Sequence, residues 1–386
     1  MTDLRDRAAA VFKREFGGDP MAAASAPGRV ELIGNHTDYN EGYIIAVALD
    51  LRVWMVGRSR PDGQARVHSL DLNTTAAFDT GAPLRQGAWI DYVQGVVHEL
   101  RGRGLAPGGF EAVIASSLPL GTGLSSSAAL EVATAIFLRQ LQPYAMEPFD
   151  LARMCRGAEN NFVGMKCGIL DQFSSVFGRR NHALFLDCRS YEYETLPLNR
   201  DDLAVVICNS MEKHALVASA YNDMQAQCFG AAAWFRTHDP SVRMLRDVSP
   251  ALFSRHEAGL DPGRRKRARH VVFENERVLA GRACLRTGDL AGFGRAMDAS
   301  HQSSRDWFEN STPRLDLLQS LAMAAPGVIG AKLSGGGFGG CLVALTARSA
   351  AESLMLALRE GCRAATGILP DTHLAAVSDG ARAEHL

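Results

Sequence analysis

The sequence predicts an α+β fold divided between two domains, and three observations lead to this prediction. First, 386 residues exceed what one hydrophobic core usually covers, since domains run to about 100–200 residues. Second, 47% of the residues are hydrophobic and 22% are charged, an ordinary globular composition that excludes disordered and collagen-like chains. Third, stretches with helical periodicity occur along the chain between short runs with the alternation typical of strands.

The first half of the chain is expected to hold strands followed by helices. Apolar side chains at helical spacing predict a helix over 5–17, and alternation predicts a short strand over 29–33. Branched residues over 44–56 predict one or two strands, and turn signals over 57–88 separate short polar strands. The other expected elements are a helix at 89–100, a strand at 110–114, a helix at 126–141, a helix capped by Asp150 and running towards Phe162, and a strand at 185–187.

The second half is expected to begin near a hinge at 185–200. This hinge divides the chain into an N-terminal domain, residues 1–190, and a C-terminal domain, residues 191–386. The elements expected after it are a strand at 203–208, a helix at 218–234, a loop at 237–263, a helix from Arg264 with Val271, Val272, Val278 and Leu279 on one face, and strands at 328–333 and 341–345.

Charge and hydropathy argue against two classes of partner. The chain has 41 Lys and Arg residues against 42 Asp and Glu residues, whereas proteins that wrap nucleic acid are far more basic. The basic run at 264–267 opens a helix with an apolar opposite face, which favours a solvated surface over a nucleic-acid site. No apolar run reaches the 18 or so residues that span a bilayer. We therefore expect neither nucleic acid nor a membrane as a partner.

The chain is expected to work in the cytoplasm. Residues 1–7 carry charges where a signal peptide needs its apolar core. The eight cysteines are scattered and form no C-x-x-C pair, which argues against a zinc site and a disulfide framework and for reduced thiols. The sequence carries no signal for the oligomeric state, and a monomer is the default expectation.

A glycine- and serine-rich loop at 118–128 suits phosphate binding. Its sequence is Leu-Pro-Leu-Gly-Thr-Gly-Leu-Ser-Ser-Ser-Ala, and a helix is expected to follow. Glycines allow the backbone to approach a ligand, a helix N-terminus attracts anions, and the hydroxyls can bind phosphate oxygens or Mg²⁺. No Lys follows the glycines, so this is not a Walker P-loop, and a plain helix cap is the alternative. The residues expected at the nucleotide are Gly121, Gly123, Leu124, Ser125, Ser126 and Ser127.

A second glycine-rich loop, residues 334–340, formally satisfies G-x-G-x-x-G through Gly335, Gly337 and Gly340. A dinucleotide fold requires a helix directly after this pattern, whereas residues 341–345 have the composition of a strand. The dinucleotide interpretation therefore fails. Glycines between two strands favour close approach to another loop or to a ligand.

A third segment, residues 28–40, crowds polar side chains after a short strand. Asn35, His36 and Asp38 offer donors and acceptors of several kinds, which suits a ligand with many hydroxyl groups. A structural turn is the alternative, and a metal site is disfavoured because no second His or Cys stands near. Asp171 follows the glycine at 168, and beside a bound phosphate it could act as a base rather than as a cap.

Together these segments resemble the galactokinase family of the GHMP small-molecule kinases. Residues 28–40 look like its sugar-binding signature, and residues 118–129 look like its nucleotide loop. Residues 167–172 are similar to the segment with the catalytic aspartate, and residues 334–340 to the third glycine-rich motif. The resemblance implies a ribosomal-protein-S5-domain-2-like N-terminal domain, a ferredoxin-like C-terminal domain, and an active site in the cleft between them. It further implies an ATP- and Mg²⁺-dependent kinase that phosphorylates the anomeric hydroxyl of galactose.

The resemblance also implies a role for individual residues. Arg29 would stabilise charge on the transferred phosphate, and Asp171 would face the anomeric hydroxyl as base or electrostatic partner. Ser127 and Glu159 match the Mg²⁺ ligands of the superfamily. Trp89 aligns roughly with an aromatic residue near the adenine, although it is equally a core residue. The residues that match sugar-contacting positions are Asn35, His36, Asp38, Gly168 and Tyr221.

Asn35 departs from the family pattern, which usually has a glutamate there, near the sixth carbon of the sugar. An amide also donates and carries no charge, so the natural substrate could differ at this carbon. Kinases for a pentose, a uronic acid or an N-acetylhexosamine are therefore alternatives. A non-catalytic galactose sensor is another, although the complete serine loop, Arg29 and Asp171 disfavour it.

Overall fold

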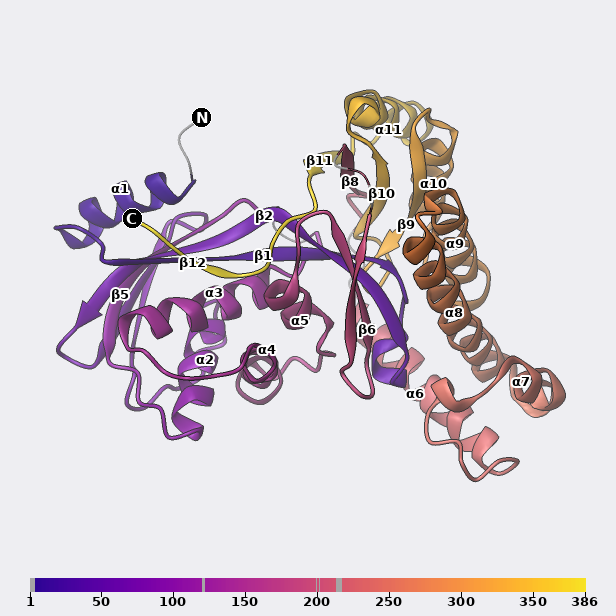
Figure 1. Cartoon of the computed structure of the whole chain (residues 1–386), viewed down its shortest axis with the longest axis horizontal. Helices are drawn as coiled ribbons and strands as arrows, with labels where there is room; N and C mark the ends of the chain where they lie inside the picture. The colour runs from indigo at the N-terminus through magenta and orange to yellow at the C-terminus, as the bar shows by residue number, and fades with distance from the viewer. Residues whose placement is uncertain (1–3, 120–121, 199, 201, 213–216) are drawn as a thin grey trace.

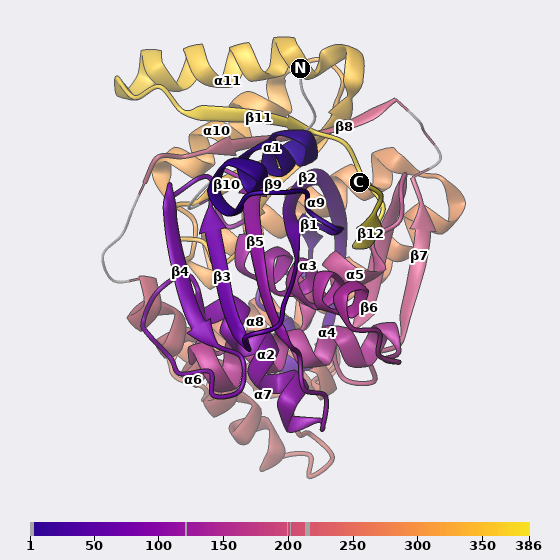
Figure 2. The same cartoon turned by 90° about the vertical axis from the view of Figure 1, so that its left-hand side faces the viewer.

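The computed structural model describes residues 4–119, 122–198, 200, 202–212 and 217–386 (Figure 1). In these residues the strands form two sheets. The larger sheet has the order β12-β1-β2-β5-β3-β4, and β6 pairs with β2 and with β7. Figure 2 shows β4 at one edge of it and β7 at the other. Its strands are β1 (Ala22–Ile33), β2 (Tyr43–Arg60), β3 (Gln64–Ser69), β4 (Thr74–Asp79), β5 (Gly109–Ser116), β6 (His182–Asp187), β7 (Tyr193–Pro197) and β12 (Arg382–Glu384).

The long strand β2 organises this sheet because it has different partners along its two halves. It pairs with β6 through residues 43–46 and with β5 through residues 53–60, while β1 runs antiparallel along its other side. Both sides of β1 are buried throughout, which explains its run of small and branched residues. The pairing of β1 with β2 shifts register between Pro27 and Arg29. Beyond this shift, Glu31 of β1 bonds Ser334 and Lys332 of the second domain.

Helices cover both faces of the larger sheet. The amphipathic helix α1 (Leu4–Phe16) buries Ala8, Val11 and Phe12 on one face. The opposite face carries the helices α2 (Asp91–Gly102), α3 (Ser126–Leu141), α4 (Pro148–Gly157) and α5 (Leu170–Phe177) (Figure 1). Burial of these apolar faces provides the main driving force for the domain.

The second sheet is antiparallel and has the order β11-β8-β10-β9. Its strands are β8 (Leu203–Asn209), β9 (Val328–Ser334), β10 (Cys341–Ala347) and β11 (Asp371–Ala375). The helices α10 (Pro313–Ala324) and α11 (Ala351–Thr366) pack on one face. The other face joins the core of the first domain through Val205, Ile207 and Val343. The two domains therefore share one continuous apolar interior.

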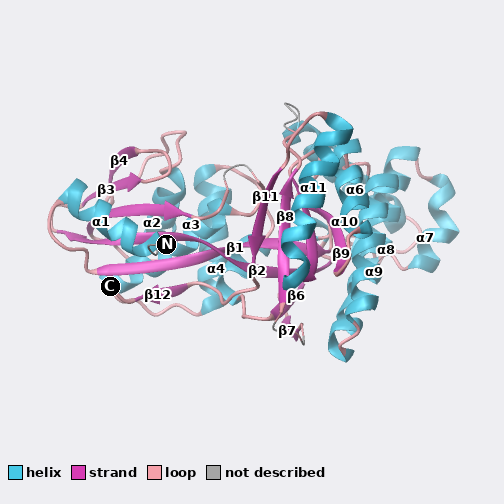
Figure 3. Cartoon of the chain, turned by 90° about the horizontal axis from the view of Figure 1, so that it is seen from above, coloured by secondary structure: helices cyan, strands magenta, loops and turns pink. Residues whose placement is uncertain are grey.

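Further helices complete the second domain, and Figure 3 shows α8–α11 as a row beside its strands. They are α6 (Val217–Arg236), α7 (Pro250–His256), α8 (Pro262–Thr287) and α9 (Leu290–Ser303). The helix α8 buries Val271, Val272 and Val278 on its apolar face, as expected. Of the basic run at 264–267, Arg264 and Arg265 are exposed, but Arg267 is buried because it bonds the carbonyl groups of Trp307 and Phe308 and the carboxylate of Glu309. Within the described ranges, no helix is both long enough and apolar enough to cross a membrane.

The two-domain α+β prediction is confirmed, and several boundaries differ from expectation. The helix over 126–141 forms as predicted, but the helix expected from residue 89 begins at Asp91. Asp150 is not a cap: α4 begins at Pro148 after the N-cap Glu147, because proline suits the first helical position. A π-helix over Ala158–Val163 then continues α4. The segment 237–263, expected to be a loop, contains α7.

The division of the chain at residues 190 and 191 stays a prediction. The hairpin of β6 and β7 spans this position and belongs to the larger sheet. The last strand, β12, also returns to the larger sheet, where Ala23 pairs with Glu384. The chain after residue 375 therefore packs with the first domain.

Candidate functional site

A cavity of about 310 Å³ lies where the two domains meet. The first domain contributes the end of β1, the loop after it and the start of α5. The second domain contributes Tyr221 of α6 and the glycine loop after β9. The lining residues are Arg29, Glu31, Asn35, His36, Asp38, Met165, Lys166, Cys167, Gly168, Leu170, Asp171, Tyr221, Gly335 and Gly336.

Arg29 and Asp171 form the charged centre of this cavity. Arg29 donates from Nε at 2.8 Å and from Nη2 at 2.6 Å, both to Oδ1 of Asp171. Ser125 Oγ donates to Oδ2 of Asp171 at 2.6 Å. The third arm of the guanidinium, Nη1, donates to the carbonyl of Gly123 at 3.0 Å. Both carboxylate oxygens are thus oriented, and the same arginine holds the glycine- and serine-rich loop.

The glycine- and serine-rich loop packs against β1 and leads into the start of α3. A Cβ at Gly28 would lie 2.5 Å from the carbonyl oxygen of Leu124, so only glycine allows this approach. Ser125 has the left-handed φ of 61° and makes no side-chain cap bond to α3. Its hydroxyl bonds Asp171 instead. The N-terminus of α3 therefore lacks a side-chain cap beside the charged centre, where its dipole favours an anion.

Ser127 and Glu159 face each other across the start of α3 and the π-helix. Ser127 Oγ donates to Oε1 of Glu159 at 3.2 Å. Burial raises the pKa of Glu159, and the charge of Asp171 raises it further. Among the described residues no group of three or more His, Cys, Asp or Glu side chains could hold a metal. A hydroxyl and one carboxylate fit Mg²⁺, which binds few protein ligands and takes the rest of its shell from phosphates and water.

His36 is neutral and fixed in orientation. Its Nε2 lies 3.1 Å from the carbonyl oxygen of Gly336, and its Nδ1 lies 2.9 Å from the hydroxyl of Tyr39. A carbonyl only accepts, so Nε2 carries the proton and Nδ1 accepts from Tyr39. The ring stacks on Phe308 with centroids 4.3 Å apart. Burial lowers the pKa of His36 to about 3.

Asp38 and Gly168 close one wall of the cavity. A Cβ at Gly168 would lie 2.5 Å from Oδ2 of Asp38, so this contact requires glycine. Burial, together with the charges of Glu31 and Asp171, raises the pKa of Asp38 to about 6. Tyr221 lines the same wall, and burial raises the pKa of its hydroxyl well above the usual value.

Asn35 uses its side chain to join the two domains. Its Nδ2 donates to the carbonyl of Gly335 at 2.7 Å, and its Oδ1 accepts from Asn310 Nδ2 at 2.8 Å. The residue is only 1% exposed. It lines the cavity, as the sequence predicts for a sugar-contacting position, but its amide is already bonded within the protein.

Two charged residues of the second domain, which the sequence did not indicate, bond β1 and the loop after it. Glu274 Oε1 accepts from the backbone N–H groups of Gly34 at 2.9 Å and Asn35 at 3.2 Å. Lys332 Nζ donates to Oε1 of Glu31 at 2.8 Å in a buried ion pair between β9 and β1. Charged residues inside apolar stretches, such as Lys332 before Leu333, are the sequence signal for such pairs.

Two residues predicted at the nucleotide, Trp89 and Gly121, do not line this cavity among the described residues. Trp89 precedes α2 and packs, partly buried, against the main core, so its contact with adenine stays a prediction. Gly121 lies outside the described residues.

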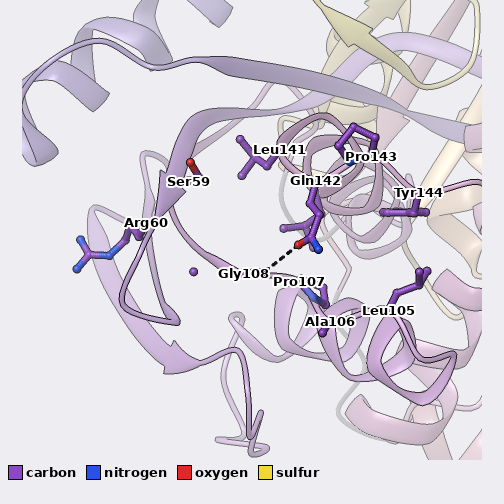
Figure 4. A pocket seen from close by; sticks show the side chains of 12 residues that line it. Ser59, Arg60, Leu105, Ala106, Pro107, Gly108, Leu141, Gln142, Pro143 and Tyr144 are labelled. Atoms are coloured by element: carbon purple, nitrogen blue, oxygen red, sulfur yellow. Dashed lines mark hydrogen bonds between the residues drawn. The ribbon is translucent and has the colours of Figure 1, made fainter.

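A separate pocket of about 110 Å³, between the end of α3 and residues 105–109, contains none of the predicted site residues (Figure 4).

Comparisons with protein families match most of the chain. Residues 10–59 match the galactokinase galactose-binding signature. Residues 91–179 match the N-terminal domain of GHMP kinases, and residues 282–364 match their C-terminal domain. The first match contains Arg29 and the polar loop after it, and the second contains the serine loop, Glu159 and Asp171.

Individual proteins are similar over nearly their whole length. The galactokinase of Roseiflexus sp. is 42% identical over 98% of this chain and 96% of its own. The galactokinase of Homo sapiens is 42% identical over 93% of this chain and 92% of its own. The crystal structure of Lactococcus lactis galactokinase complexed with galactose has a TM-score of 0.90 at 32% identity and covers 97% of this chain and 98% of its own. Methanococcus jannaschii mevalonate kinase shares the fold, with a TM-score of 0.69 at 16% identity over 94% of this chain and 99% of its own.

Proposed function

The chain belongs to the galactokinase family of the GHMP kinases, and we propose that it transfers the γ-phosphate of ATP to the anomeric hydroxyl of galactose. The products are galactose 1-phosphate and ADP. The observation that carries this proposal is the array of Arg29, Asp171 and Ser125, in which one carboxylate is bonded to an arginine and to the serine loop at the edge of a cavity.

The sugar occupies the cavity in this proposal. Asp38 accepts hydrogen bonds from sugar hydroxyls when it is ionised, and neutral His36 and Tyr221 supply the wall beside it. Gly168 brings backbone close to the sugar without a side chain. Asn35 closes the end of the cavity and holds the glycine loop of the second domain against it.

The nucleotide phosphates bind at the start of α3, where the backbone at 123–127 approaches the charged centre. Ser127 and Glu159 hold Mg²⁺, which neutralises charge on the phosphate groups when it is bound. Arg29 stabilises the charge that develops on the transferred phosphate, a task suited to a guanidinium fork. Trp89 remains a proposed neighbour of the adenine.

Asp171 acts on the anomeric hydroxyl that receives the phosphate. Its carboxylate accepts the proton of the anomeric hydroxyl or acts as an electrostatic partner that orients this hydroxyl. Arg29 and Ser125 hold both oxygens, so the carboxylate keeps one orientation before the substrate arrives. Phosphoryl transfer depends mainly on positioning and electrostatics, which this arrangement provides.

The alternatives have less support. A non-catalytic sensor would not need both bonded pairs, Arg29 with Asp171 and Ser127 with Glu159. A kinase for another sugar was suggested by Asn35, but that side chain is bonded to the second domain. The similarity to a galactose complex over 97% of the chain favours galactose. We also propose that the protein works in the cytoplasm and acts as a monomer. Its partner in this proposal is a small sugar, and neither nucleic acid nor a membrane is involved.

A coupled ADP-release assay with ATP and Mg²⁺ tests this proposal. The sugars to compare are galactose, arabinose, galacturonate and N-acetylgalactosamine. We expect the highest kcat/KM for galactose, and ³¹P spectroscopy should show the phosphate on the anomeric oxygen. Turnover of galacturonate above that of galactose, or no sugar-dependent ADP release at all, would contradict it.

A further inference from the structure

Behind the proposed cation site lies a buried amide that touches two carboxylates. Gln172, the residue after Asp171, donates from Nε2 to Oε2 of Glu159 at 2.7 Å and to Oε2 of Glu131 at 2.9 Å. Gln172 and Glu131 are fully buried, and Glu159 is 7% exposed. The side-chain nitrogen has two hydrogens, so each carboxylate receives one of them. If the amide were turned over, its oxygen would face Oε2 of Glu131 and Oε2 of Glu159, which are acceptors. The orientation with the nitrogen toward these two oxygens is therefore fixed.

Two oxygens in this group lack partners. Among the described residues, Oε1 of Glu131 and Oε1 of Gln172 are buried and accept no hydrogen bond. These atoms belong to two side chains that already share one N–H···O bond. A proton on Oε1 of Glu131 would supply the donor that Oε1 of Gln172 lacks, because a carboxylic acid and a primary amide pair through two parallel hydrogen bonds. Burial raises the pKa of Glu131 well above its usual value, and the charge of Glu159 raises it further.

We propose that Glu131 and Gln172 form a neutral acid–amide pair whose function is to position Glu159 for the cation. Gln172 holds Oε2 of Glu159, and Oε1 consequently remains directed to Ser127 Oγ at 3.2 Å. The pair rests on the proposed function, since Ser127 and Glu159 are the cation ligands there. Gln172 and Glu131 touch neither substrate, so they are positioning residues.

The helices explain why this pair couples two parts of the site. Glu131 lies one turn after Ser127 on α3, and Gln172 follows Asp171 on α5. Glu159 lies in the π-helix, a geometry that frequently occurs at functional sites. One amide therefore links the helix of the phosphate loop, the helix of the catalytic carboxylate and the cation ligand. Partners that hydrogen-bond a metal ligand typically change metal affinity by about 10–100-fold when removed.

The test measures Mn²⁺ binding by electron paramagnetic resonance in the presence of saturating ADP, with the full chain. Gln172→Met keeps the length of the side chain and removes both N–H bonds. We expect its Mn²⁺ Kd to rise about tenfold or more, while the Kd for galactose, measured by calorimetry without nucleotide, changes less than twofold. The matched control is Gln319→Met, which removes the bond at 2.7 Å from a buried glutamine to Asp298 in the second domain. Its Mn²⁺ Kd should equal that of the wild type.

Two variants at residue 131 test the pair itself. Glu131→Gln replaces the acid by an amide that can make the same two bonds, so its Mn²⁺ Kd should stay within about twofold of the wild type. Glu131→Leu should weaken Mn²⁺ binding as Gln172→Met does. Unchanged Mn²⁺ binding by Gln172→Met would overturn the proposal, as would equal Mn²⁺ Kd values for Glu131→Gln and Glu131→Leu. The comparison of Glu131→Gln with Glu131→Leu tests the proposal even if Gln172→Met fails to fold. A wild type without saturable Mn²⁺ binding would instead contradict the proposed cation site.

Discussion

Arg29 donates two hydrogen bonds to one oxygen of Asp171, from Nε at 2.8 Å and from Nη2 at 2.6 Å. The two residues are 142 positions apart in the chain. The remaining nitrogen of the guanidinium, Nη1, donates to the carbonyl of Gly123 in the glycine- and serine-rich loop. The proposed base and the loop proposed to bind the nucleotide are therefore held by the same side chain, so a change at Arg29 should affect both.

Replacing Arg29 by Lys should lower kcat at least tenfold. A lysine keeps the positive charge, but its single ammonium group cannot bond Asp171 and Gly123 in the planar geometry of the guanidinium. Arg29→Met, which also loses the charge, should lower kcat further, towards the roughly 10²–10³-fold loss seen when one charge-stabilising donor is removed. Steady-state kinetics with ATP and galactose measure both variants. Equal kcat values for the two variants would show that the charge of Arg29 has no role.

Asn35→Asp should weaken both folding and sugar binding. An aspartate has the same shape but offers an oxygen where Asn35 donates to Gly335 at 2.7 Å. Leaving a buried group without its partner costs about 1–3 kcal/mol in the free energy of unfolding. Asn209→Asp is the matched control, because Asn209 uses its oxygen to accept from Met211 N, and aspartate keeps that bond. Denaturant titration and the galactose KM test this, and similar effects of both substitutions would count against it.

Asp38 should make stability and galactose binding depend on pH in opposite directions. Burial raises its pKa from 3.8 to about 6. Folding therefore favours the protonated form, and the stability that this group contributes is present below about pH 4 and is lost as pH rises through 6. Galactose affinity should rise over the same interval, because an ionised carboxylate accepts hydrogen bonds from hydroxyl groups more strongly than a protonated one.

Asp38→Asn should flatten both profiles between about pH 4 and 6. Thermal unfolding and calorimetric titration with galactose at several pH values measure them. Asp62→Asn is the control, since the hydrogen bond from Arg60 lowers the pKa of exposed Asp62 to about 2, and its titration lies outside this interval. Galactose affinity that is independent of pH in the wild type would remove Asp38 from sugar binding.

Glu274→Gln should loosen the loop that carries His36. Although burial opposes ionisation, the charge of Arg277 lowers the pKa of Glu274 to about 2. The group thus stabilises the fold above its unfolded pKa of 4.5, and this stability is lost as pH falls through 2. Hydrogen bonds to a charged group contribute about 1.5–3 kcal/mol each, so the variant should be less stable at pH 7 and have a higher galactose KM. Ser300→Ala removes one bond to Glu274 and should have a smaller effect on both quantities.

Local patterns in the sequence predicted much of the fold and the positions of its loops. The helix over 126–141 was predicted at its observed ends, because a run of serines precedes a continuous stretch of helix-forming residues. Helices over 290–303, 313–324 and 351–366 were not predicted. The last could have been found, since Leu354, Leu358 and Cys362 recur every four residues and are buried. In α10 the buried residues Leu315, Leu318 and Ala322 are flanked by other apolar side chains, which hides the period.

In the candidate site, too, the sequence indicated the residues of local motifs but not the contacts between distant parts of the chain. Motif residues such as Arg29, Asp171 and Ser125 were recognised from their neighbours in the chain. The contacts from Asn310 to Asn35 and from Glu274 to the backbone at 34–35 join residues more than 200 positions apart. They depend on how α8 and the glycine loop pack against β1, which no local pattern encodes. The departure of Asn35 from the family pattern was visible, but its bonding to the second domain was not.

The turnover of Asp171→Asn tests the central claim most directly. The amide keeps the shape of the carboxylate but takes no proton and carries no charge. We expect galactose-dependent ADP release to fall towards the low end of roughly 10²–10⁴-fold, because phosphoryl transfer depends mainly on positioning and electrostatics, while the Kd for MgATP changes less than twofold. Retention of more than about half of the wild-type kcat would contradict the account, because Asp171 would then have no part in the transfer.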